Sequence, residues 1–538
     1  MATRDRLQRL AASDTDSSES YPIGLTLVSG AVATAVLFPI LWLVVRVLGM
    51  NPNAIVSNLT AGATLTVVAN SAALVTAVTA GSILIGVPLA VLTVQTDLPF
   101  RRFWTVVGAL PLVIPSYIGA FTYASALGPQ GELADALAPL GIQSIPSIYG
   151  FTGTALVLTL FTYPYVFLTT RASLLSFDST LVEAARTLNH SRWEAFKRVT
   201  VPQILPGIAA GSLLVGLYAL SDFGTPMIMQ FEVFTQQIYV QYNAWGRDPA
   251  ALLSLQLVAV TVVILALESR ISAGAKTGTR SSNRSATFKL GPWRYPALLF
   301  SSVVAFLCLV VPLGMLAYWM QRVEPTYGSS TFTFQWQYAW SSVAVSGLAA
   351  LAAIIAAVPV AYFAARHSST LSNVLDRATY VGYAIPGVVL GLSLVSFGSA
   401  YAPALYQTIP LLLFAYVVRF LPQAVGAVGS SVVQVDPKLT EAAQTLGHSP
   451  AAAFRKVTLP LIAPGVAAGA ALVFLTTMKE LPATLILRPP EFETLVTYIW
   501  QVQASGLYDK AAIPALVLVA ISGLSLLIII KREDYDVK

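Results

Sequence analysis

Four ionisable side chains stand inside otherwise apolar stretches of this 538-residue sequence: Asp222, Arg419, Lys479 and Glu480. A charge at membrane depth is costly, and its presence favours a functional role. Asp222 and Glu480 occupy corresponding positions in two related stretches, so both carboxylates could line a central pathway and guide a cationic substrate. The alternative is that each is paired with a donor on a neighbouring helix or lies near the outer interface. For Arg419 we expect a static partner or a backbone carbonyl contact, whereas Lys479 cannot share a helical face with Glu480.

The sequence shows no pattern of residues that is typical of an ATP-hydrolysing, metal-binding or nucleophilic active site. The sequence contains no Gly-Lys dipeptide, which excludes a Walker A phosphate-binding loop. Its three histidines (His190, His367 and His448) and its single cysteine, Cys308, do not have metal-ligand spacing. There is also no nucleophile with a matching base. The sequence therefore predicts no catalytic residue, no metal site and no cofactor bound by the chain itself.

The composition is that of an integral membrane protein. Hydrophobic residues make up 56% of the chain and charged residues only 10%, whereas a soluble domain carries roughly 25% charged residues. The apolar runs are continuous over about 20 residues, as in membrane-spanning helices, and lack the alternation of an outer-membrane barrel. We therefore expect an all-α polytopic membrane protein, which excludes a disordered chain, a collagen-like fibre and a disulfide scaffold. About twelve transmembrane helices are predicted, at 22–48, 68–94, 103–127, 148–172, 206–230, 250–269, 295–320, 341–365, 377–400, 409–432, 464–487 and 511–531.

The basic residues indicate the orientation of these helices. If the N-terminus is inside, most of the 31 Lys and Arg residues fall in cytoplasmic segments and few in outer loops, which predicts that both termini are cytoplasmic. The net charge of +6 is then a topology signal and does not indicate nucleic acid. The first apolar run is too long for a signal peptide, so we expect it to remain as a helix. The polar residues 1–21 are predicted to form a disordered tail.

The sequence also repeats itself. Asn70-Ser71 matches Ser341-Ser342, and further along the chain Asp222 matches Glu480 in a constant register. Because each half has six spans, the halves should have the same orientation and form two parallel six-helix repeats, related by a pseudo-twofold axis along the membrane normal. The predicted boundaries are a cytoplasmic tail at 1–21, a first transmembrane helix with its outer loop at 22–65, a first repeat unit at 66–269, a flexible cytoplasmic linker at 270–294, a seventh transmembrane helix with its outer loop at 295–337, a second repeat unit at 338–531 and a cytoplasmic C-terminus at 532–538.

The closest match between the halves lies after the fourth span of each, at 183–207 and 441–465. Both segments predict a short helix, a turn and a second short helix. Asn189 and Gly447 tolerate the left-handed conformation that ends the first helix. Ser191 and Ser449 are suited to cap the second helix, with a capping box in the first half only. Four prolines are then expected to break the chain where it re-enters the membrane: Pro202, Pro206, Pro460 and Pro464. The alternative is that both segments are ordinary amphipathic linkers on the membrane surface.

These segments resemble the "EAA" signature of binding-protein-dependent ABC transporter permeases. The second half matches it with Glu441, Ala442, Ala443, Gly447 and Pro460, and the first half departs from it once, with Asn189 in the glycine position. In that family the segment docks into a cleft on a separate ATP-binding subunit. The resemblance therefore implies that the following residues couple the chain to an ATPase: Glu183, Ala184, Ala185, Leu188, Asn189, Pro202, Glu441, Ala442, Ala443, Leu446, Gly447 and Pro460.

The resemblance also implies partners and a place in the cell. Two copies of the ATPase, which bind ATP and Mg, would serve the two segments, and an extracytoplasmic binding protein would deliver the substrate. The chain would be a multi-pass protein of the plasma or inner membrane. A fused double permease of this length resembles the iron(III) transport permeases. A permease for thiamine, phosphonate or another small solute is the alternative. A secondary transporter that uses Asp222 and Glu480 as proton or sodium sites is a further hypothesis, against which the duplicated coupling segments argue.

Overall fold

The computed structural model describes residues 23–129, 131–140, 146–176, 185, 187–188, 191–244, 246–275, 288–322, 332–367 and 369–535. Over these residues the chain is helical, with one isolated β-bridge between Thr96 and Phe288. The described helices include ten that are long and apolar enough to cross a membrane, or up to twelve if each of two bent helix pairs is one span. The predicted all-α membrane fold is therefore confirmed.

The helices of the first half are α2 (Ile23–Leu48), α3 (Pro52–Thr60), α4 (Gly62–Gln95), α5 (Arg101–Ala109), a 3-10 turn (Leu110–Val113), α6 (Ser116–Leu127), α7 (Glu132–Leu137), a second 3-10 turn (Ala138–Leu140), α8 (Phe151–Leu175), α10 (Arg192–Ala195), a π turn (Phe196–Thr200), α11 (Val201–Ser221), α12 (Gly224–Ile228), α13 (Phe234–Asn243) and α14 (Arg247–Ala275).

Those of the second half are a 3-10 turn (Gly291–Trp293), α15 (Arg294–Ala305), a π turn (Phe306–Val310), α16 (Val311–Gln321), α17 (Trp336–Arg366), α18 (Thr370–Ala384), α19 (Gly387–Tyr401), α20 (Ile409–Gln434), α21 (Pro437–Thr445), α22 (Pro450–Ala453), a π turn (Phe454–Thr458), α23 (Leu459–Met478), α24 (Pro482–Leu487), α25 (Leu495–Ala504) and α26 (Tyr508–Tyr535).

The internal repeat has a structural counterpart in these elements. In the first half the Ser71 hydroxyl of α4 accepts a hydrogen bond from the Phe234 amide at the start of α13, at 3.2 Å. In the second half the Ser342 hydroxyl of α17 accepts one from the Leu495 amide at the start of α25, at 2.8 Å. The matched serines of the sequence therefore tie equivalent helices together in both halves.

Two predicted spans, 103–127 and 377–400, are not straight helices. In each, a first helix turns sharply into a second, by 90° before α6 and by 100° between α18 and α19. Pro115 and Pro386 are the N-cap residues of the second helices. Because proline disfavours the helical conformation for the residue before it, Ile114 and Ile385 are extended. An apolar run that is long enough to span the membrane therefore does not show whether the chain bends within it.

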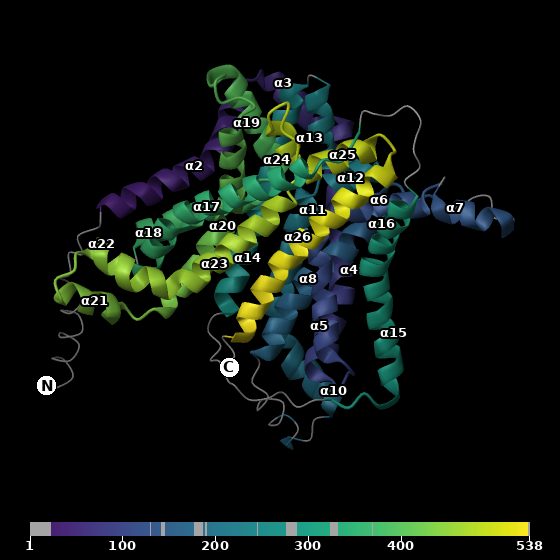
Figure 1. The fold of residues 1–538 in the computed structure, drawn as a ribbon, viewed down its shortest axis with the longest axis horizontal. Coiled ribbons are helices and arrows are strands. Elements are labelled where there is room, and N and C mark those ends of the chain that lie inside the picture. Colours follow the sequence, from purple (N-terminus) through teal and green to yellow (C-terminus); the bar gives the residue numbers. More distant parts are fainter. Residues whose placement is uncertain are drawn as a thin grey trace.

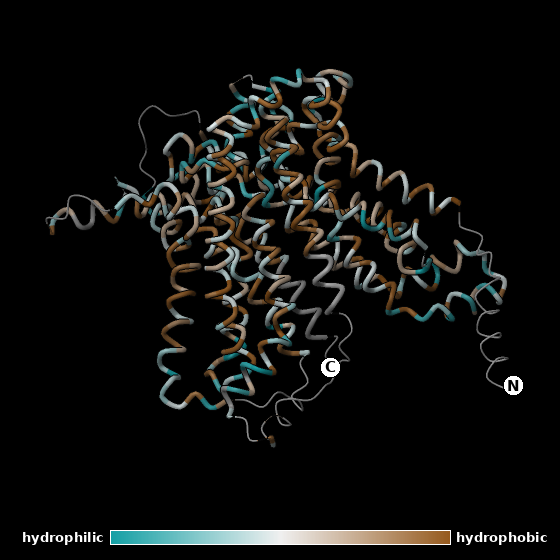
Figure 2. Tube along the Cα trace, turned by 180° about the vertical axis from the view of Figure 1, so that it is seen from behind, coloured by the Kyte–Doolittle hydropathy of each residue, from teal (hydrophilic) through white to brown (hydrophobic). Residues whose placement is uncertain are grey.

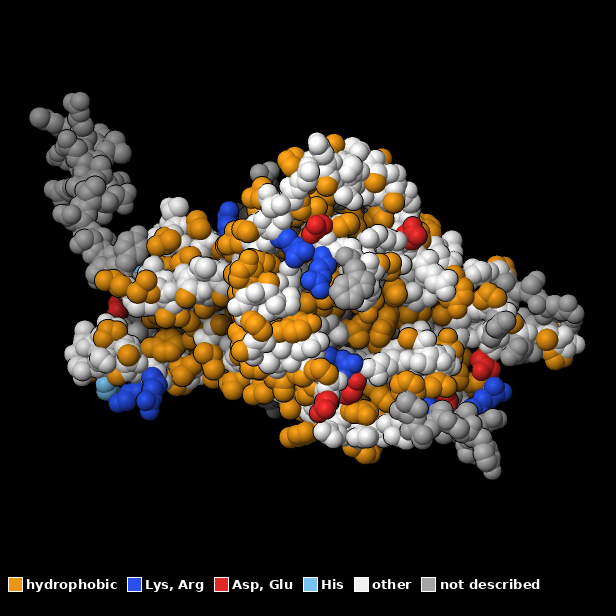
Figure 3. All heavy atoms as spheres, turned by 90° about the horizontal axis from the view of Figure 1, so that it is seen from above, with side chains coloured by type: hydrophobic (Ala, Val, Ile, Leu, Met, Phe, Trp, Pro, Cys, Tyr) orange, Lys and Arg blue, Asp and Glu red, His pale blue; other side chains and the backbone are white. Residues whose placement is uncertain are grey.

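Two legs of helices diverge from a common region (Figure 1). Helices α4, α5, α8 and α15 run together to the end that carries α10, whereas α17, α18, α20 and α23 run to the end that carries α21 and α22. Hydrophobic residues predominate along the long helices in Figure 2. Figure 3 shows wide hydrophobic areas with a few small groups of charged side chains. Such a surface suits a lipid environment.

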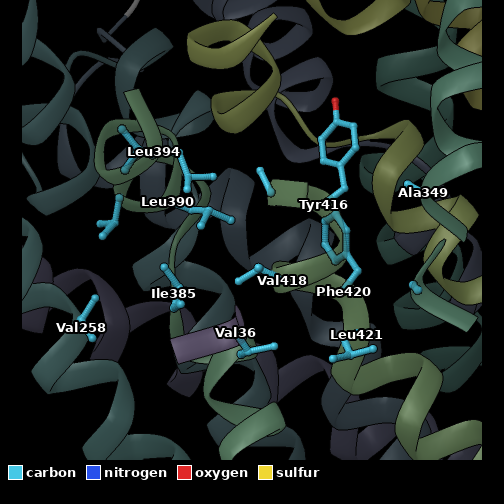
Figure 4. Close-up of a cluster of buried hydrophobic side chains, with 14 of the residues drawn as sticks. Val36, Val258, Ala349, Ile385, Leu390, Leu394, Tyr416, Val418, Phe420 and Leu421 are labelled. Atoms are coloured by element: carbon cyan, nitrogen blue, oxygen red, sulfur yellow. The ribbon is translucent and has the colours of Figure 1, made fainter. Parts of the chain in front are cut away.

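The first helix of each half packs on the other half. Helix α2 lies against α17, α18 and α19, while α16 lies against α6. Val36 of α2 is only 1% exposed, and Figure 4 shows it among Val418 and Leu421 of α20. The Ser393 hydroxyl of α19 also donates a hydrogen bond to the Pro39 carbonyl of α2, at 2.7 Å. The hydrophobic core is therefore shared across the repeat boundary.

The end of the predicted flexible linker at 270–294 is fastened to the first half. Residues 276–287 lie outside the described part of the chain. After them, the Phe288 amide donates to the Gln95 carbonyl at 2.7 Å, and the Leu290 amide donates to the Asp97 carboxylate at 2.7 Å. The Leu290 hydrogen bond, helped by the Arg294 guanidinium at 3.6 Å, lowers the pKa of Asp97. The polar composition of the linker predicted flexibility and did not indicate these hydrogen bonds to the end of α4.

Candidate functional site

A cavity of about 180 Å³ lies between the two halves and is lined by residues of both. The first half contributes Ser116, Tyr117, Tyr165, Tyr218 and Asp222, among others, and the second half contributes Tyr383, Arg419, Gln423, Lys479 and Glu480. The structure thus brings together all four of the intramembrane charges that the sequence analysis singled out.

Asp222 is held by uncharged donors. It follows α11 directly, and its carboxylate accepts hydrogen bonds from the Ser116 hydroxyl and from the Thr225 amide, the latter at 2.9 Å. The Tyr218 hydroxyl donates in turn to the Ser116 oxygen at 3.1 Å. Among the described residues Asp222 has no ion-pair partner. Its hydrogen bonds therefore come from uncharged groups, although Arg419 of the same cavity also acts on it electrostatically.

Glu480, at the matching position, is held by a cation. Its carboxylate forms an ion pair with the Arg419 guanidinium of α20 at 3.1 Å and accepts a hydrogen bond from the Ala483 amide at 3.2 Å. The Glu480 side chain is only 2% exposed. The static partner expected for Arg419 is thus present. Gly387, which matches Ser116 in the repeat, has no side chain here, and a Cβ atom on it would collide with both Arg419 and Glu480.

Lys479 crosses from one half to the other. Its ammonium donates a hydrogen bond to the Leu112 carbonyl of the first half at 2.7 Å. Because α23 ends at Met478, Lys479 and Glu480 lie in a break between helices and both line the cavity. The expectation that they could not share a helical face concerned a continuous helix, which the chain does not form at these two residues. Asp222 likewise lies between α11 and α12, not deep along one straight helix.

The coupling segment of the second half folds as predicted up to its prolines. The Asp436 side chain caps the start of α21, Gly447 follows the C-cap residue of α21 with a φ of +88°, and the Ser449 side chain caps α22. The chain does not break at the prolines, however. One helical span runs over Pro450–Met478. Pro460 lies in the first turn of α23, after a π turn, where a proline is tolerated. Pro464 lies inside α23, which continues past it.

The two alanines of the second coupling segment face opposite ways. Glu441, Ala442 and Leu446 are exposed, with Leu446 at 83%. Ala443 is only 7% exposed and packs within the chain. The Thr440 and Thr458 hydroxyls, 3.1 Å apart, tie the same side of α21 to the π turn. Ala443 was expected on a docking surface, but its small size lets α21 lie against its own chain.

In the first coupling segment Glu183, Ala184, Asn189 and His190 lie outside the described residues. Of the others, Ala185 is buried and Leu188 is 75% exposed, as their counterparts Ala443 and Leu446 are. The predicted capping box is present, with the Ser191 amide 2.9 Å from Glu194 Oε2 and the Glu194 amide 3.2 Å from Ser191 Oγ. Pro202 lies in the first turn of α11, as Pro460 does in α23.

Sequence reasoning missed several residues that build the cavity: Ser116, Tyr218, Tyr383, Gly387 and Gln423. The Pro-Ser pair at 115–116 and the Pro-Gly pair at 386–387 stand at matching places in the repeat. A proline repeated inside two apolar runs was therefore the available signal for a bend with a functional residue after it. The tyrosines carried no signal, because their places depend on how the helices pack.

Taken together, two related helical units with a polar cavity between them and similar capped segments at their ends define a membrane transport protein. The chain belongs to the family of binding-protein-dependent transport system inner membrane components, whose model matches residues 82–324 and 357–532. It is thus the permease of an ABC importer and a multi-pass inner membrane protein.

Three relatives illustrate the similarity. The chain is 31% identical to the Fe(3+)-transport system permease protein of Haemophilus influenzae, over 95% of this chain and 98% of that protein. It is 23% identical to the ferric transport system permease protein of Actinobacillus pleuropneumoniae, over 75% of this chain and 61% of that protein. It is 22% identical to the thiamine transport system permease protein of Escherichia coli, over 80% of this chain and 82% of that protein.

Proposed function

We propose that this permease imports iron(III). The observation that carries the proposal is the near full-length similarity to the Fe(3+)-transport permease of Haemophilus influenzae. The cavity between the halves supports it, because Asp222 and Glu480 supply two carboxylates at the place where both units break their helices. In this proposal the cavity is the pathway, both carboxylates line it, and Asp222, which has no ion-pair partner among the described residues, guides the cationic cargo.

Two ATPase subunits dock on the two coupling segments, one on each. Support comes from Leu188 and Leu446, which are exposed at matching positions of the two segments. An exposed leucine is an apolar side chain that a cleft on a partner can bury. ATP and Mg are bound by these partners, and the permease itself contributes no bond-breaking chemistry, no metal site and no cofactor site.

The rest of the assembly follows from this arrangement. The coupling ends and both termini face the cytoplasm, and an outer binding protein delivers the substrate on the opposite side. The two permease units, at 66–269 and 338–531, rock between inward-open and outward-open states when the ATPases close and open. The diverging legs of Figure 1, with a coupling segment at the end of each, are consistent with an inward-open state.

Cysteine cross-linking tests the docking. Leu188→Cys and Leu446→Cys, each made with Cys308→Ser, should both cross-link to the ATPase. Ala443→Cys is the matched control, because its side chain packs inside the permease and should react poorly. If only one leucine position cross-links at all, the docking model with two sites is wrong.

Uptake into proteoliposomes that contain the permease, its ATPase and its binding protein tests the substrate. We expect ⁵⁵Fe(III) to accumulate with ATP and not with a non-hydrolysable analogue. Accumulation of ¹⁴C-thiamine without iron would favour the thiamine alternative, which the Escherichia coli relative suggests. Uptake driven by a proton or sodium gradient without any ATPase would instead identify a secondary transporter.

A further inference from the structure

A basic corner with exposed aromatic rings lies where the linker between the halves returns to the first half. It consists of residues 100–103 at the start of α5 and residues 289–295 at the start of α15, and we call it the α5–α15 corner. Helices α5 and α15 are in contact. Just before α5, the Asp97 carboxylate accepts a hydrogen bond from the Leu290 amide at 2.7 Å and lies 3.6 Å from the Arg294 guanidinium. Two segments that are distant in the chain therefore form one surface.

The α5–α15 corner is strongly positive. It contains the cations Arg101, Arg102, Lys289 and Arg294, and the nearby Asp97 pairs with Arg294. The other three cations are exposed and form no ion pair within the part of the chain that the structure describes. Because like charges held close together repel one another, a bound anion would stabilise the corner.

Four aromatic rings of the corner are exposed to the surroundings. The exposed fractions are 81% for Phe100, 57% for Phe103, 73% for Trp293 and 76% for Tyr295. Phe100 also has a φ of +57°, which is uncommon for a bulky residue. Aromatic side chains, above all Trp and Tyr, are enriched where a membrane meets water. The rings therefore indicate contact with the headgroup region of a bilayer.

A row of apolar side chains places the corner at the end of a lipid-facing surface. Along α15 and the π turn after it, Leu299, Val303, Phe306 and Val310 are between 47% and 66% exposed. Their spacing of three or four residues puts them on one helical face with Tyr295, and α15 stands at the edge of the molecule in Figure 1. Tyr295 ends this row, so the corner lies where acyl chains give way to headgroups.

The second half lacks the charges of the corner. In the repeat register that aligns the two bend prolines, Ser372 and Asn373 of α18 take the places of Arg101 and Arg102. The positions on either side of each pair are apolar and exposed in both halves. Contact with acyl chains is thus common to both halves, whereas the cations are particular to the first. Because the equivalent helix forms without them, the fold does not require the two arginines, which favours a ligand.

We propose that the α5–α15 corner binds the phosphate headgroup of an anionic phospholipid. Arg101 and Arg102 donate hydrogen bonds to the phosphate oxygens, the aromatic rings lie among the headgroups, and the acyl chains follow the exposed row of α15. Basic sites between membrane-spanning helices bind anionic headgroups in this way. In the orientation proposed above, the lipid belongs to the cytoplasmic leaflet. The inference is independent of the cargo that the permease imports.

Quenching of Trp293 fluorescence by brominated lipids tests the inference, because bromine quenches a tryptophan that it contacts. Wild type and Trp293→Phe are reconstituted into phosphatidylcholine vesicles that contain increasing fractions of brominated phosphatidylglycerol or of brominated phosphatidylcholine. The difference between the two proteins gives the signal of residue 293. We expect half-maximal quenching at a lower fraction of brominated phosphatidylglycerol, and this preference should weaken in high salt.

Charge variants assign the preference to the two arginines. Arg101→Gln and Arg102→Gln should each lower it by about fivefold, the order expected for one cation near an anionic lipid surface. Arg101→Lys keeps the charge and should retain most of the preference. Arg377→Gln, which removes an exposed cation from α18 on the other leg, is the matched control and should leave the preference unchanged. Quenching by brominated phosphatidylcholine should be the same in all variants, which checks that the corner still meets the membrane.

Three results would overturn the inference. Equal quenching by both lipids in wild type would show that the corner does not select an anionic headgroup. A preference that survives in both glutamine variants would show that the arginines do not bind it. If added ATPase shields Trp293 from both brominated lipids, the corner belongs to the docking surface of that partner and not to a lipid site.

Discussion

The first half of the protein holds its cavity carboxylate with a hydroxyl group, and the second half holds its own with a guanidinium. The Ser116 hydroxyl donates a hydrogen bond to Asp222, whereas Arg419 forms an ion pair with Glu480. The residue of the second half that matches Ser116 is Gly387, which has no side chain to donate. The position that matches Arg419 in the first half is Phe161, which is buried in the core. The same backbone break thus carries an ion pair in one half and a carboxylate held by uncharged hydrogen-bond donors in the other.

This difference teaches how a duplicated fold divides its tasks. Glu480 is longer than Asp222 by one methylene group and reaches a fixed cation, so its surroundings are neutral overall. Asp222 lines the cavity without an ion-pair partner among the described residues, so its carboxylate is available to a ligand. We therefore interpret the Glu480 side of the cavity as structural and the Asp222 side as the side that responds to the substrate.

Replacement of Arg419 by Met should have the largest effect. It leaves the Glu480 carboxylate buried without a cation, and breaking such a pair costs about 3–5 kcal/mol. Thermal unfolding of the purified variant should show a much lower midpoint, and uptake should be lost. The double variant Arg419→Met with Glu480→Gln removes both charges and should regain much of the stability. A single variant as stable as wild type would show that the ion pair does not support the fold.

Exchange of the residues that follow the two prolines should have the next largest effect. Gly387→Ser forces a side chain into Arg419 and Glu480, and overpacking of this kind costs about 1–3 kcal/mol. Ser116→Ala in the first half removes one hydrogen bond, worth about 1 kcal/mol, and the Thr225 amide still serves Asp222. Unfolding midpoints of the two variants compare these losses. Equal losses would mean that the halves do not differ as described.

A smaller and local effect is expected at the coupling turn. Gly447 has a φ of +88°, and an added Cβ would meet nothing within 4 Å, so Gly447→Val should cost only backbone strain of about 1–2 kcal/mol. The strain should distort the turn after Leu446 and reduce copurification of the ATPase. Gly447→Asn is the matched control, and Asn189→Gly in the first half should be tolerated. Full ATPase binding by Gly447→Val would show that the docking surface does not need this turn.

The smallest effect on stability should come from Asp222→Asn. The amide keeps an acceptor for the Thr225 amide and removes a charge that has no cationic partner, so the unfolding midpoint should hardly move. Iron uptake should nevertheless fall by about tenfold, because the charge that faces the cargo is gone. ATPase copurification serves as the internal control and should stay normal. Unchanged uptake would assign Asp222 a structural role and remove the functional difference between the halves.

Local rules predicted the parts of this protein that depend on neighbouring residues. The spans follow from apolar length, the turn at Gly447 from positive φ, and the cap at Ser449 from helix-end chemistry. The bends at Pro115 and Pro386 were missed because a measure of apolar length does not register where a helix turns. The proline breaks after the coupling segments were predicted and are absent: Pro202 and Pro460 lie in the first turns of α11 and α23, and Pro206 and Pro464 are accommodated inside the same helices.

Contacts between distant residues could not be predicted in the same way. Nothing near Arg419 in sequence indicates that Glu480 is its partner, and nothing near Lys479 indicates the Leu112 carbonyl. The inward orientation of Ala443 likewise depends on the Thr440–Thr458 contact, which joins two short helices across a turn. Such facts depend on packing, and a single sequence without its relatives does not encode them in a form that can be read directly.

The packing of α2 on the second half has a consequence for biogenesis. When the ribosome has made only the first half, α2 can pack on α14, but Val36, which is 1% exposed in the finished fold, and the rest of the face that will meet α17, α18 and α19 still lie against lipid. Helices α17 to α19 are synthesised hundreds of residues later, and only then does α2 find its place. The N-terminal helix is therefore among the first to enter the membrane and among the last to be seated. A chain truncated after α14 would carry an unfinished helix for a membrane quality-control protease to recognise.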